Sequence, residues 1–249
     1  MSLQAKDLYV GYSGHAVLGN INASLEQGEM TVLIGANGSG KSTLLRTLAG
    51  AQSPLSGEVL IDNTPVKSLS ASKLARKLAI VLTDRTGGGG LRVNELVAIG
   101  RHPFTGFFGK IGNSDREAIR EALNDVGLSA KSRCFVTELS DGERQKAMIA
   151  RAIAQSTPII LLDEPTSFLD VSSRFEIMEL LSNLAHNYNK AILLSTHDTA
   201  AALTVADRVW AVAGNTLHIG GIDDFAGNGI LDNVFEGIKF DFKLRDFKR

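Results

Sequence analysis

The sequence has few of the features that mark secreted, disulfide-bonded or membrane-spanning proteins. Its single cysteine, Cys134, excludes an internal disulfide and a cysteine metal cluster, and we expect it to be a small buried hydrophobic residue. No apolar run approaches the roughly 20 residues that a transmembrane helix needs. The first residues also lack the apolar stretch of a signal peptide. We therefore expect a cytosolic protein that meets a membrane only through a partner.

A strong net charge is also missing. The 26 basic and 27 acidic residues leave a formal net charge of −1, so nothing global indicates a nucleic-acid partner. Hydrophobic residues make up 44% and charged residues 21%, which is ordinary for a soluble globular protein. The length of 249 residues suits one large α/β domain or two small ones.

The most informative stretch that is present is a glycine-rich loop at residues 35–43. Its sequence, Gly-Ala-Asn-Gly-Ser-Gly-Lys-Ser-Thr, fits the pattern G-x-x-x-x-G-K-[ST] at every fixed position. A short apolar run at 30–34 precedes it and predicts a buried strand, and leucines at helical spacing follow it up to Gly50. Strand, glycine loop and helix in this order predict a phosphate-binding site.

The residue types in this loop suit the binding of a triphosphate. Glycines let backbone N–H groups converge on an anion, and the following helix adds the positive end of its dipole. Lys41 is expected to reach the β- and γ-phosphates, and the Ser42 hydroxyl to ligate Mg²⁺. The expected nucleotide-contacting residues of the loop are Gly35, Asn37, Gly38, Ser39, Gly40, Lys41, Ser42 and Thr43.

Strands that alternate with helices predict an α/β fold with a mostly parallel sheet. Region 91–155 has a helical pattern without a strand signal, so we expect a helical subdomain inserted into the α/β core, after a glycine-rich boundary at 84–90. One of its helices is expected to start with a capping box at 114–117, and a second near Gly142. Strands are expected at residues 3–10, 21–34 with a turn at 26–29, 58–63, 78–82, 159–164, 191–195 and 208–212, and a short helix at 70–77.

Two carboxylates end the apolar strand at 159–164. Ligands of parallel sheets bind at the carboxyl ends of strands, and the phosphate loop, this acidic pair and His197 all fall at such ends. Asp163 is expected to hold Mg²⁺, directly or through water, and Glu164 to orient or deprotonate an attacking water. His197 is expected to hydrogen-bond the γ-phosphate or that water.

Tyr12 has two interpretations that its spacing does not separate. It lies 29 residues before Lys41, so on the sheet edge beside the loop it would stack on an adenine ring. Alternatively, it is a turn tyrosine that packs on the sheet.

Together these motifs resemble the ATP-binding subunit of ABC transporters, over residues 3 to about 225. Residues 139–145 (Leu-Ser-Asp-Gly-Glu-Arg-Gln) are similar to the family signature LSGGQ, 159–164 to Walker B and 167–170 to the D-loop. His197 matches the switch histidine and Tyr12 the adenine-stacking aromatic. The resemblance implies ATP and Mg²⁺ as cofactors, ATP hydrolysis coupled to transport, and a P-loop NTPase core with an N-terminal antiparallel β subdomain.

The resemblance also implies how the chain assembles. Two copies would pair head to tail, so that each ATP lies between one copy's phosphate loop and the other's signature. Membrane-embedded permease subunits would dock on the helical subdomain, together with a substrate-binding protein as an indirect partner, which places the chain peripherally on the cytoplasmic face of the membrane. The signature and D-loop residues expected at the interface are Ser140, Asp141, Gly142, Glu143 and Asp170. The whole chain, 1–249, would be one domain, with its core at about 1–84 and 156–230, the helical subdomain at about 91–155 and an extension at 231–249.

Two positions depart from the family pattern. The glutamine expected after the strand at 78–82 is replaced by Asp84, a shorter and charged group that could still ligate Mg²⁺. Asp141 replaces the first glycine of the signature, where a carboxylate would repel a γ-phosphate unless it faces away or caps the helix that follows. Of these two, we expect capping.

Weaker signals concern the cargo and the end of the chain. Segments 100–104 and 106–109 resemble importers of iron chelates, heme and cobalamin, which we expect as the cargo class. The alternative is an aromatic packing surface for any permease helix. Alternation at 238–245 predicts a half-buried strand that packs on the chain's own core. Two other functions fit the same motifs: a soluble ABC ATPase of iron–sulfur cofactor assembly, or a nucleotide-sensing scaffold with little hydrolysis, which the two substituted positions favour.

Overall fold

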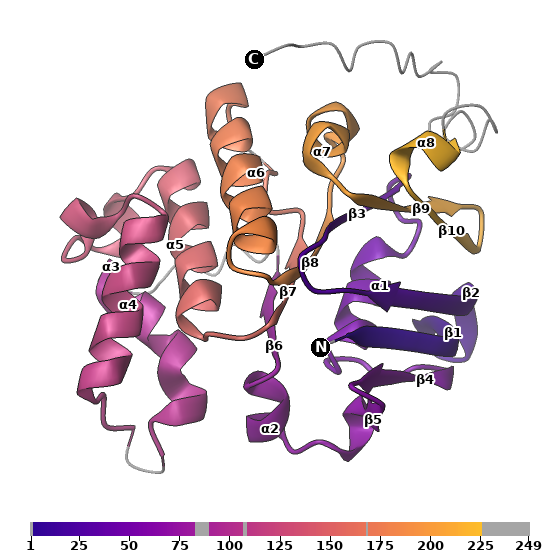
Figure 1. Cartoon of the computed structure of the whole chain (residues 1–249), viewed down its shortest axis with the longest axis horizontal. Helices are drawn as coiled ribbons and strands as arrows, with labels where there is room; N and C mark the ends of the chain where they lie inside the picture. The colour runs from indigo at the N-terminus through magenta and orange to yellow at the C-terminus, as the bar shows by residue number, and fades with distance from the viewer. Residues whose placement is uncertain (1, 83–89, 107–108, 168, 226–249) are drawn as a thin grey trace.

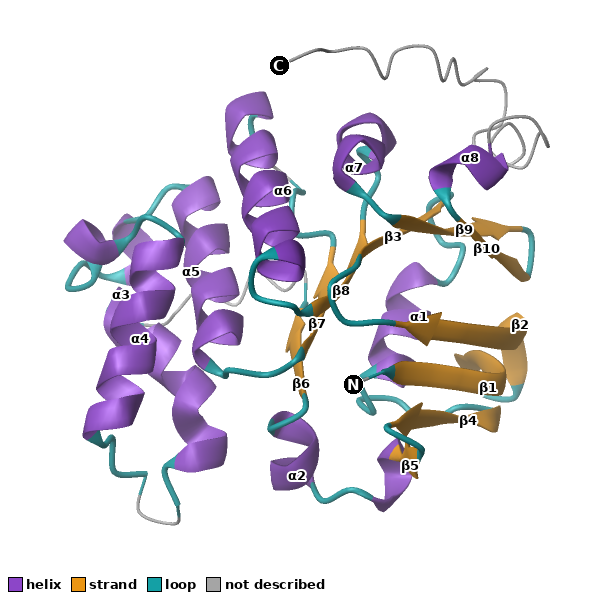
Figure 2. Ribbon diagram, in the orientation of Figure 1, coloured by secondary structure: helices purple, strands orange, loops and turns teal. Residues whose placement is uncertain are grey.

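The computed structural model describes residues 2–82, 90–106, 109–167 and 169–225 (Figures 1 and 2). A six-stranded sheet forms its centre, with the strand order β10-β9-β3-β8-β7-β6. The pairs among β9, β3, β8, β7 and β6 are all parallel, and only β10 runs antiparallel to its neighbour. The strands are β3 (Met30–Gly35), β6 (Leu78–Val81), β7 (Ile159–Asp163), β8 (Ala191–Ser195), β9 (Arg208–Ala213) and β10 (Thr216–Gly220).

The N-terminal part of the chain forms a second, antiparallel sheet in the order β2-β1-β4-β5. Helix α1 (Lys41–Leu48) lies between the two sheets (Figure 1), and its leucines share one apolar cluster with residues of both. The strands of this sheet are β1 (Leu3–Tyr12), β2 (His15–Leu25), β4 (Ser56–Ile61) and β5 (Thr64–Pro65).

The central sheet is buried on both faces, which explains its nearly continuous apolar strands. In β3, Val32 and Ile34 face a cluster formed with the helices on one side, whereas Leu33 faces α1 and the N-terminal sheet. Helices α6 (Val171–His186) and α7 (Thr199–Val205) lie along the first of these faces, as Figure 2 shows, and the short α8 (Ile222–Phe225) follows β10. The layers confirm the expected P-loop type of α/β fold.

A helical segment is inserted between β6 and β7. Helices α3, α4 and α5 pack together beside the core, on the left of Figure 1. Cys134, in a loop of this segment, is only partly buried, so the expectation of a buried hydrophobic residue was too strong. The helices are α3 (Val93–Ala98), α4 (Asn113–Asp125) and α5 (Asp141–Ala154), with 3-10 turns η2 (Ile99–Phe104), η3 (Ser129–Lys131) and η4 (Val136–Glu138).

The start of α4 differs from the expected capping box at 114–117. The helix begins at Asn113, and the Asp115 carboxylate accepts a hydrogen bond of 2.9 Å from the Gly112 N–H group. Ser114 therefore lies inside the helix. The Asp115 carboxylate, and not the Ser114 hydroxyl, accepts a hydrogen bond from a free N–H group at the start of the helix.

Other expected elements shift by a few residues. The helix expected at 70–77 is α2 (Ala71–Ala75), which follows the 3-10 turn η1 (Val66–Ser68), and β2 begins six residues earlier than the strand expected from residue 21. Asp84, the segment at 107–108 and the alternating tail at 238–245 lie outside the described residues. Among the helices that the structure describes, none combines the length and the apolar character needed to cross a membrane.

Candidate functional site

The phosphate loop joins β3 to α1, and its backbone adopts a conformation that requires glycine at two positions. Gly38 and Gly40 have φ angles of 75° and 98°, in the left-handed region that favours glycine. A Cβ atom at Gly40 would lie 2.6 Å from a methyl carbon of Val17, so packing as well as φ excludes a side chain there. The Ser39 hydroxyl is buried and has no hydrogen-bond partner among the described residues, which leaves its donor for a ligand.

Lys41 is folded back over this loop. Its Nζ atom donates to the carbonyl oxygens of Gly35 and Ala36, at 2.8 and 2.9 Å, and the residue is only 5% exposed. Burial lowers the pKa of Lys41, and the nearby carboxylates of Glu164 and Asp163 partly offset that effect. A buried ammonium whose partners are neutral carbonyls is poised to exchange them for phosphate oxygens.

Ser42 and Asp163 come together although 121 residues separate them. The Ser42 hydroxyl donates to Asp163 Oδ1 at 3.0 Å, and the buried Ser195 hydroxyl donates to the same oxygen at 2.8 Å. The sequence patterns did not predict a role for Ser195. The one signal for it was that a polar residue ends the apolar strand at 191–195. Hydroxyl and carboxylate oxygens are the ligands that Mg²⁺ prefers, so Ser42 and Asp163 fit this ion.

Glu164 sits in a strained turn directly after β7. Its φ angle is 50°, a left-handed value that costs a non-glycine residue about 1–3 kcal/mol and that is concentrated at functional sites. The Ser195 hydroxyl accepts from the Glu164 N–H group at 2.9 Å, and the Ser167 hydroxyl donates to Glu164 Oε2 at 3.0 Å. His197 Nε2 lies 2.6 Å from Glu164 Oε1. The structure thus brings together the acid and the histidine that the sequence placed at separate strand ends.

Tyr12 lies beside the start of α1. The Thr43 hydroxyl donates to the Tyr12 hydroxyl at 2.9 Å, while half of the tyrosine remains exposed. The tyrosine is therefore fixed at its hydroxyl end and open to a ligand elsewhere, so both interpretations of this residue remain compatible with its position.

The signature segment starts α5, and its serine caps the helix. The Ser140 hydroxyl accepts from the Glu143 N–H group at 3.3 Å, and Glu143 Oε2 accepts from the Ser140 N–H group at 3.1 Å. Asp141 does not cap the helix, so that expectation was wrong. It is the first helical residue, and its carboxylate, 66% exposed, instead pairs with Arg144 at 3.0 Å.

The D-loop residue Asp170 caps the next helix, α6. Its carboxylate accepts from both the N–H group and the hydroxyl of Ser173, each at 2.9 Å. These hydrogen bonds lower the pKa of Asp170, the bond from the backbone N–H group being the larger cause. A Cβ atom at Gly142 would lie 3.0 Å from the Ser173 hydroxyl, so the starts of α5 and α6 are in close contact.

The buried Arg101 joins the segment at 100–104 to helices α4 and α5. Arg101 is 7% exposed, and its guanidinium pairs with Asp115 at 2.9 Å and donates to the Ala154 carbonyl at 2.7 Å. It also stacks on the Phe104 ring, with 4.1 Å between the guanidinium carbon and the ring centroid. In this part of the segment, Arg101 has an internal packing role that its sequence pattern did not reveal.

Fold and site together define a P-loop nucleotide-binding protein: a glycine loop before a helix, a strand-end aspartate beside the loop serine, and a glutamate paired with a histidine. Comparisons with known proteins identify the family within this class of nucleotide-binding proteins. A family profile described as ABC transporter matches residues 18–167. The chain belongs to the ABC transporter ATP-binding family, and such ATP-binding subunits of transporters are ATPases.

Two curated relatives illustrate the similarity. An uncharacterized ABC transporter ATP-binding protein of Methanocaldococcus jannaschii is 42% identical over 207 residues, which are 83% of this chain and 71% of that protein. A probable siderophore transport system ATP-binding protein of Bacillus subtilis is 36% identical over 235 residues, which cover 94% and 86% of the two chains.

Solved structures agree with this assignment. An ABC transporter assigned to the metal-chelate type, in an inward-facing conformation, superposes with a TM-score of 0.83 at 27% identity, over 94% of this chain and 88% of that chain. A dimeric ATP-binding cassette in a post-hydrolysis state, bound to ADP and phosphate, gives a TM-score of 0.75 at 28% identity, over 88% and 98%.

Proposed function

We propose that this chain hydrolyses ATP to energise the import of an iron-siderophore, heme or cobalamin-type substrate. The observation that carries the catalytic part is the convergence of Ser42, Asp163, Glu164 and His197 beside the phosphate loop. The cargo class is supported by the siderophore transport relative of Bacillus subtilis and by the metal-chelate type transporter among the structural neighbours.

In this proposal each residue of the site has a distinct role. The backbone N–H groups of the loop, the Ser39 hydroxyl and Lys41 bind the phosphates of ATP. Ser42 and Asp163 hold Mg²⁺, which neutralises charge on the phosphate oxygens when it is bound. Glu164 orients the attacking water and takes up its proton, and His197 fixes the carboxylate and contacts the γ-phosphate.

The proposal includes a head-to-tail dimer in which each signature faces the partner's ATP. The N-terminus of α5, whose dipole favours an anion, would supply backbone N–H groups near Gly142 to the partner's γ-phosphate. The dimeric cassette among the structural neighbours supports pairing of two copies. The position of the signature at the start of α5, away from the phosphate loop before α1, is compatible with a head-to-tail arrangement.

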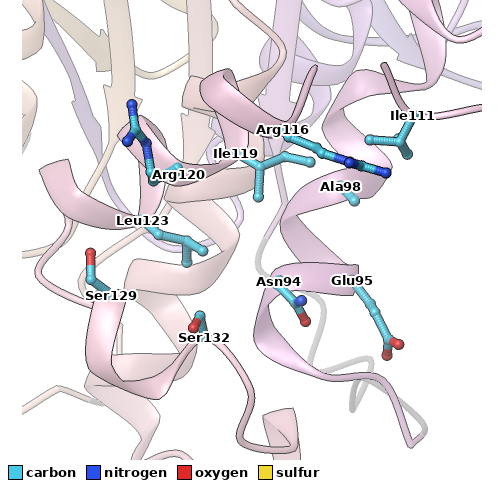
Figure 3. A pocket seen from close by; sticks show the side chains of 10 residues that line it. All are labelled: Asn94, Glu95, Ala98, Ile111, Arg116, Ile119, Arg120, Leu123, Ser129 and Ser132. Atoms are coloured by element: carbon cyan, nitrogen blue, oxygen red, sulfur yellow. The ribbon is translucent and has the colours of Figure 1, made fainter. Parts of the chain in front are cut away.

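We further propose that a permease subunit docks on the helical subdomain, which would hold the chain peripherally at the cytoplasmic face of the membrane. A hollow of about 460 Å³ opens between α3 and α4 (Figure 3). The buried side chains of Ile119 and Leu123 form part of its lining, together with the exposed charges of Glu95, Arg116 and Arg120. Such a site suits a short amphipathic helix, because the apolar lining would take its apolar face and Arg116 would take a carboxylate. Arg120 is already paired with Glu117 at 3.0 Å.

Uptake measurements in cells that lack this chain test the proposal. Wild-type protein should restore ATP-dependent uptake of a labelled ferric siderophore, heme or cobalamin. Glu164→Gln should restore none and should lower turnover by about 10²–10⁴-fold, because it removes the general base. If wild-type protein hydrolyses ATP but none of these substrates depends on it for uptake, the cargo assignment is wrong.

The docking site is tested in the same cells. Replacing Arg116 and Arg120 together by glutamate should reduce uptake while the ATPase rate of the isolated subunit stays unchanged, since neither residue lies at the nucleotide site. The exposed Lys67 provides a control for charge reversal elsewhere on the surface, and Lys67→Glu should leave uptake intact. Equal uptake by the double variant and by the control would exclude this hollow as the docking site.

The two alternatives predict other outcomes. A soluble ATPase of iron–sulfur assembly would leave uptake normal and lower the activity of iron–sulfur enzymes when the chain is deleted. A nucleotide-sensing scaffold would bind ATP without turnover in any context, so that Glu164→Gln would change nothing.

A further inference from the structure

An ion pair joins the D-loop to the loop that carries His197. Arg174 lies in the first turn of α6, and its Nη1 atom is 3.2 Å from Asp198 Oδ2. Its Nε atom donates to the Leu169 carbonyl at 2.8 Å. One guanidinium therefore holds the backbone just before Asp170 and the carboxylate just after His197, in the fork geometry that lysine cannot reproduce.

Asp198 is fixed at its other oxygen. Its Oδ1 atom accepts from the Ala201 N–H group at 3.3 Å and so caps α7, which leaves Oδ2 for Arg174. Asp198, His197, Glu164 and Arg174 all line one hollow of about 270 Å³. The position of His197 is thus set from two sides: by α7 through the cap, and by α6 through the guanidinium.

The same turn of α6 also touches the signature. The Ser173 hydroxyl, next to Arg174 in the sequence, is the group that a side chain at Gly142 would contact. The first turn of α6 therefore lies between the start of α5 and the loop of His197. In a head-to-tail dimer the start of α5 and the loop of His197 would contact different ATP molecules, because the signature faces the nucleotide bound by the partner.

We propose that Arg174 is a positioning residue for ATP hydrolysis, which holds His197 against Glu164 and links its position to the D-loop and signature. The inference rests on the proposed catalytic roles of Glu164 and His197. Arg174 itself does not touch the reacting atoms. Partly exposed ion pairs usually contribute little to stability, so the expected effect is on turnover rather than on folding.

Three substitutions distinguish the positive charge of Arg174 from the fork geometry of its guanidinium group. Asp198→Asn keeps an oxygen that can cap α7 but removes the charge that faces Arg174. Arg174→Lys keeps a positive charge but loses the fork that joins Asp198 to the Leu169 carbonyl. Arg174→Ala removes both interactions.

Lys77→Ala provides a matched control. Lys77 pairs with Asp62 at the same distance of 3.2 Å, and the side chains are 30% and 39% exposed, compared with 37% and 28% for Arg174 and Asp198. It is placed on a different part of the core and outside the catalytic hollow.

Steady-state ATPase assays and nucleotide titrations give the decisive readout. Arg174→Ala and Asp198→Asn should each lower kcat by about tenfold, with KM and the Kd for ATP within about twofold of wild type. Their combination should be no worse than Arg174→Ala alone, since both changes remove the same ion pair between Arg174 and Asp198. Arg174→Lys should fall between wild type and Arg174→Ala. Lys77→Ala should match wild type.

Unchanged kcat in Arg174→Ala, or additive losses in the double variant, would overturn the inference. Melting temperatures measured alongside must stay near wild type, and a parallel loss of stability and turnover would make Arg174 merely structural. Failure of the proposed function would look different, because wild-type protein would then lack turnover altogether.

Discussion

At the scale of single residues, the ion pair between Asp141 and Arg144 suggests how a carboxylate would be accommodated in the proposed signature. Asp141 stands where the family has glycine, at the helix end proposed to bind the partner's γ-phosphate. Arg144 pairs with it at 3.0 Å and also donates to the Leu139 carbonyl. The charge of Asp141 is thus compensated by Arg144. An incoming phosphate would therefore meet less repulsion from this carboxylate.

This neutralisation can be tested in a Glu164→Gln background, in which hydrolysis is blocked. Arg144→Ala should raise the ATP concentration needed for half-maximal dimerisation by about two- to fivefold, as expected for loss of an exposed ion pair. Asp141→Asn alone should have little effect, and adding it to Arg144→Ala should restore the wild-type value. Light scattering during an ATP titration measures all four proteins. A double variant as weak as Arg144→Ala would show that Arg144 acts by another route.

Residues that carry chemistry in a short local pattern were predictable, and those defined by the fold were not. The loop at 35–43 and the strand that ends in Asp163 and Glu164 are motifs with fixed spacing. Ser195 gained its role only because β8 lies next to β7, so that its hydroxyl meets Asp163. Asp141 was assigned to the cap because aspartate is a strong capping residue. Ser140, one position earlier, occupies the cap and leaves the carboxylate outside.

At the scale of elements, the buried pair of Arg101 and Asp115 connects α4 to the segment that follows α3. Hydrogen bonding by the Gly112 N–H group and by Arg101 lowers the pKa of Asp115 below its ordinary 3.8. A carboxylate whose pKa is lowered by folding contributes stability that is complete above the unfolded pKa. This contribution is lost as the pH falls through the folded pKa.

Asp115→Asn should therefore destabilise the protein in a pH-dependent way. At pH 7 the variant should lose about 1.5–3 kcal/mol of unfolding free energy, the range for hydrogen bonds to charged groups. The difference from wild type should shrink as the pH falls from about 5 towards 3, because wild type loses its own contribution there. Urea unfolding at a series of pH values measures this. Asp62→Asn, at an exposed ion pair, is the control, and a pH-independent difference would contradict the argument.

The sequence predicted strands with strong apolar runs to within one or two residues. It did not predict the edge strand β10 or the start of α4. The strand at 191–195 matches β8, because a strand buried on both faces needs a continuous apolar sequence. Strand β10 was missed, since its residues are only partly buried and its pairing with β9 defines it more than its own pattern does. The start of α4 was misplaced because serine and aspartate at neighbouring positions offer competing caps.

At the scale of the whole molecule, the two sheets and the inserted helices place the phosphate loop and the signature on separate elements of one chain. The loop lies between β3 and α1, whereas the signature starts α5 in the inserted helical segment. Among the described residues, the side chain and N–H group of Ser140 bond to Glu143, and the nearest neighbours of Gly142 are Ser173 and Leu169, none of which belongs to the phosphate loop. The signature is thus available to a nucleotide held by a second copy, and ATP would be the connecting ligand.

Light scattering of Glu164→Gln with ATP and Mg²⁺ tests this arrangement. Glutamine keeps an oxygen that can accept from Ser167, so the turn after β7 should stay folded while the bound ATP is not consumed. The mass should double when ATP and Mg²⁺ are added and return to that of one chain when they are removed, because ligand binding at the interface stabilises the dimer by mass action. Lys41→Ala should remain monomeric, since it loses the cation that meets the phosphates. If Glu164→Gln binds ATP in a titration but keeps the mass of one chain, the signature of the isolated subunit does not close on the partner's nucleotide. The closing surface would then require the permease to align the two copies.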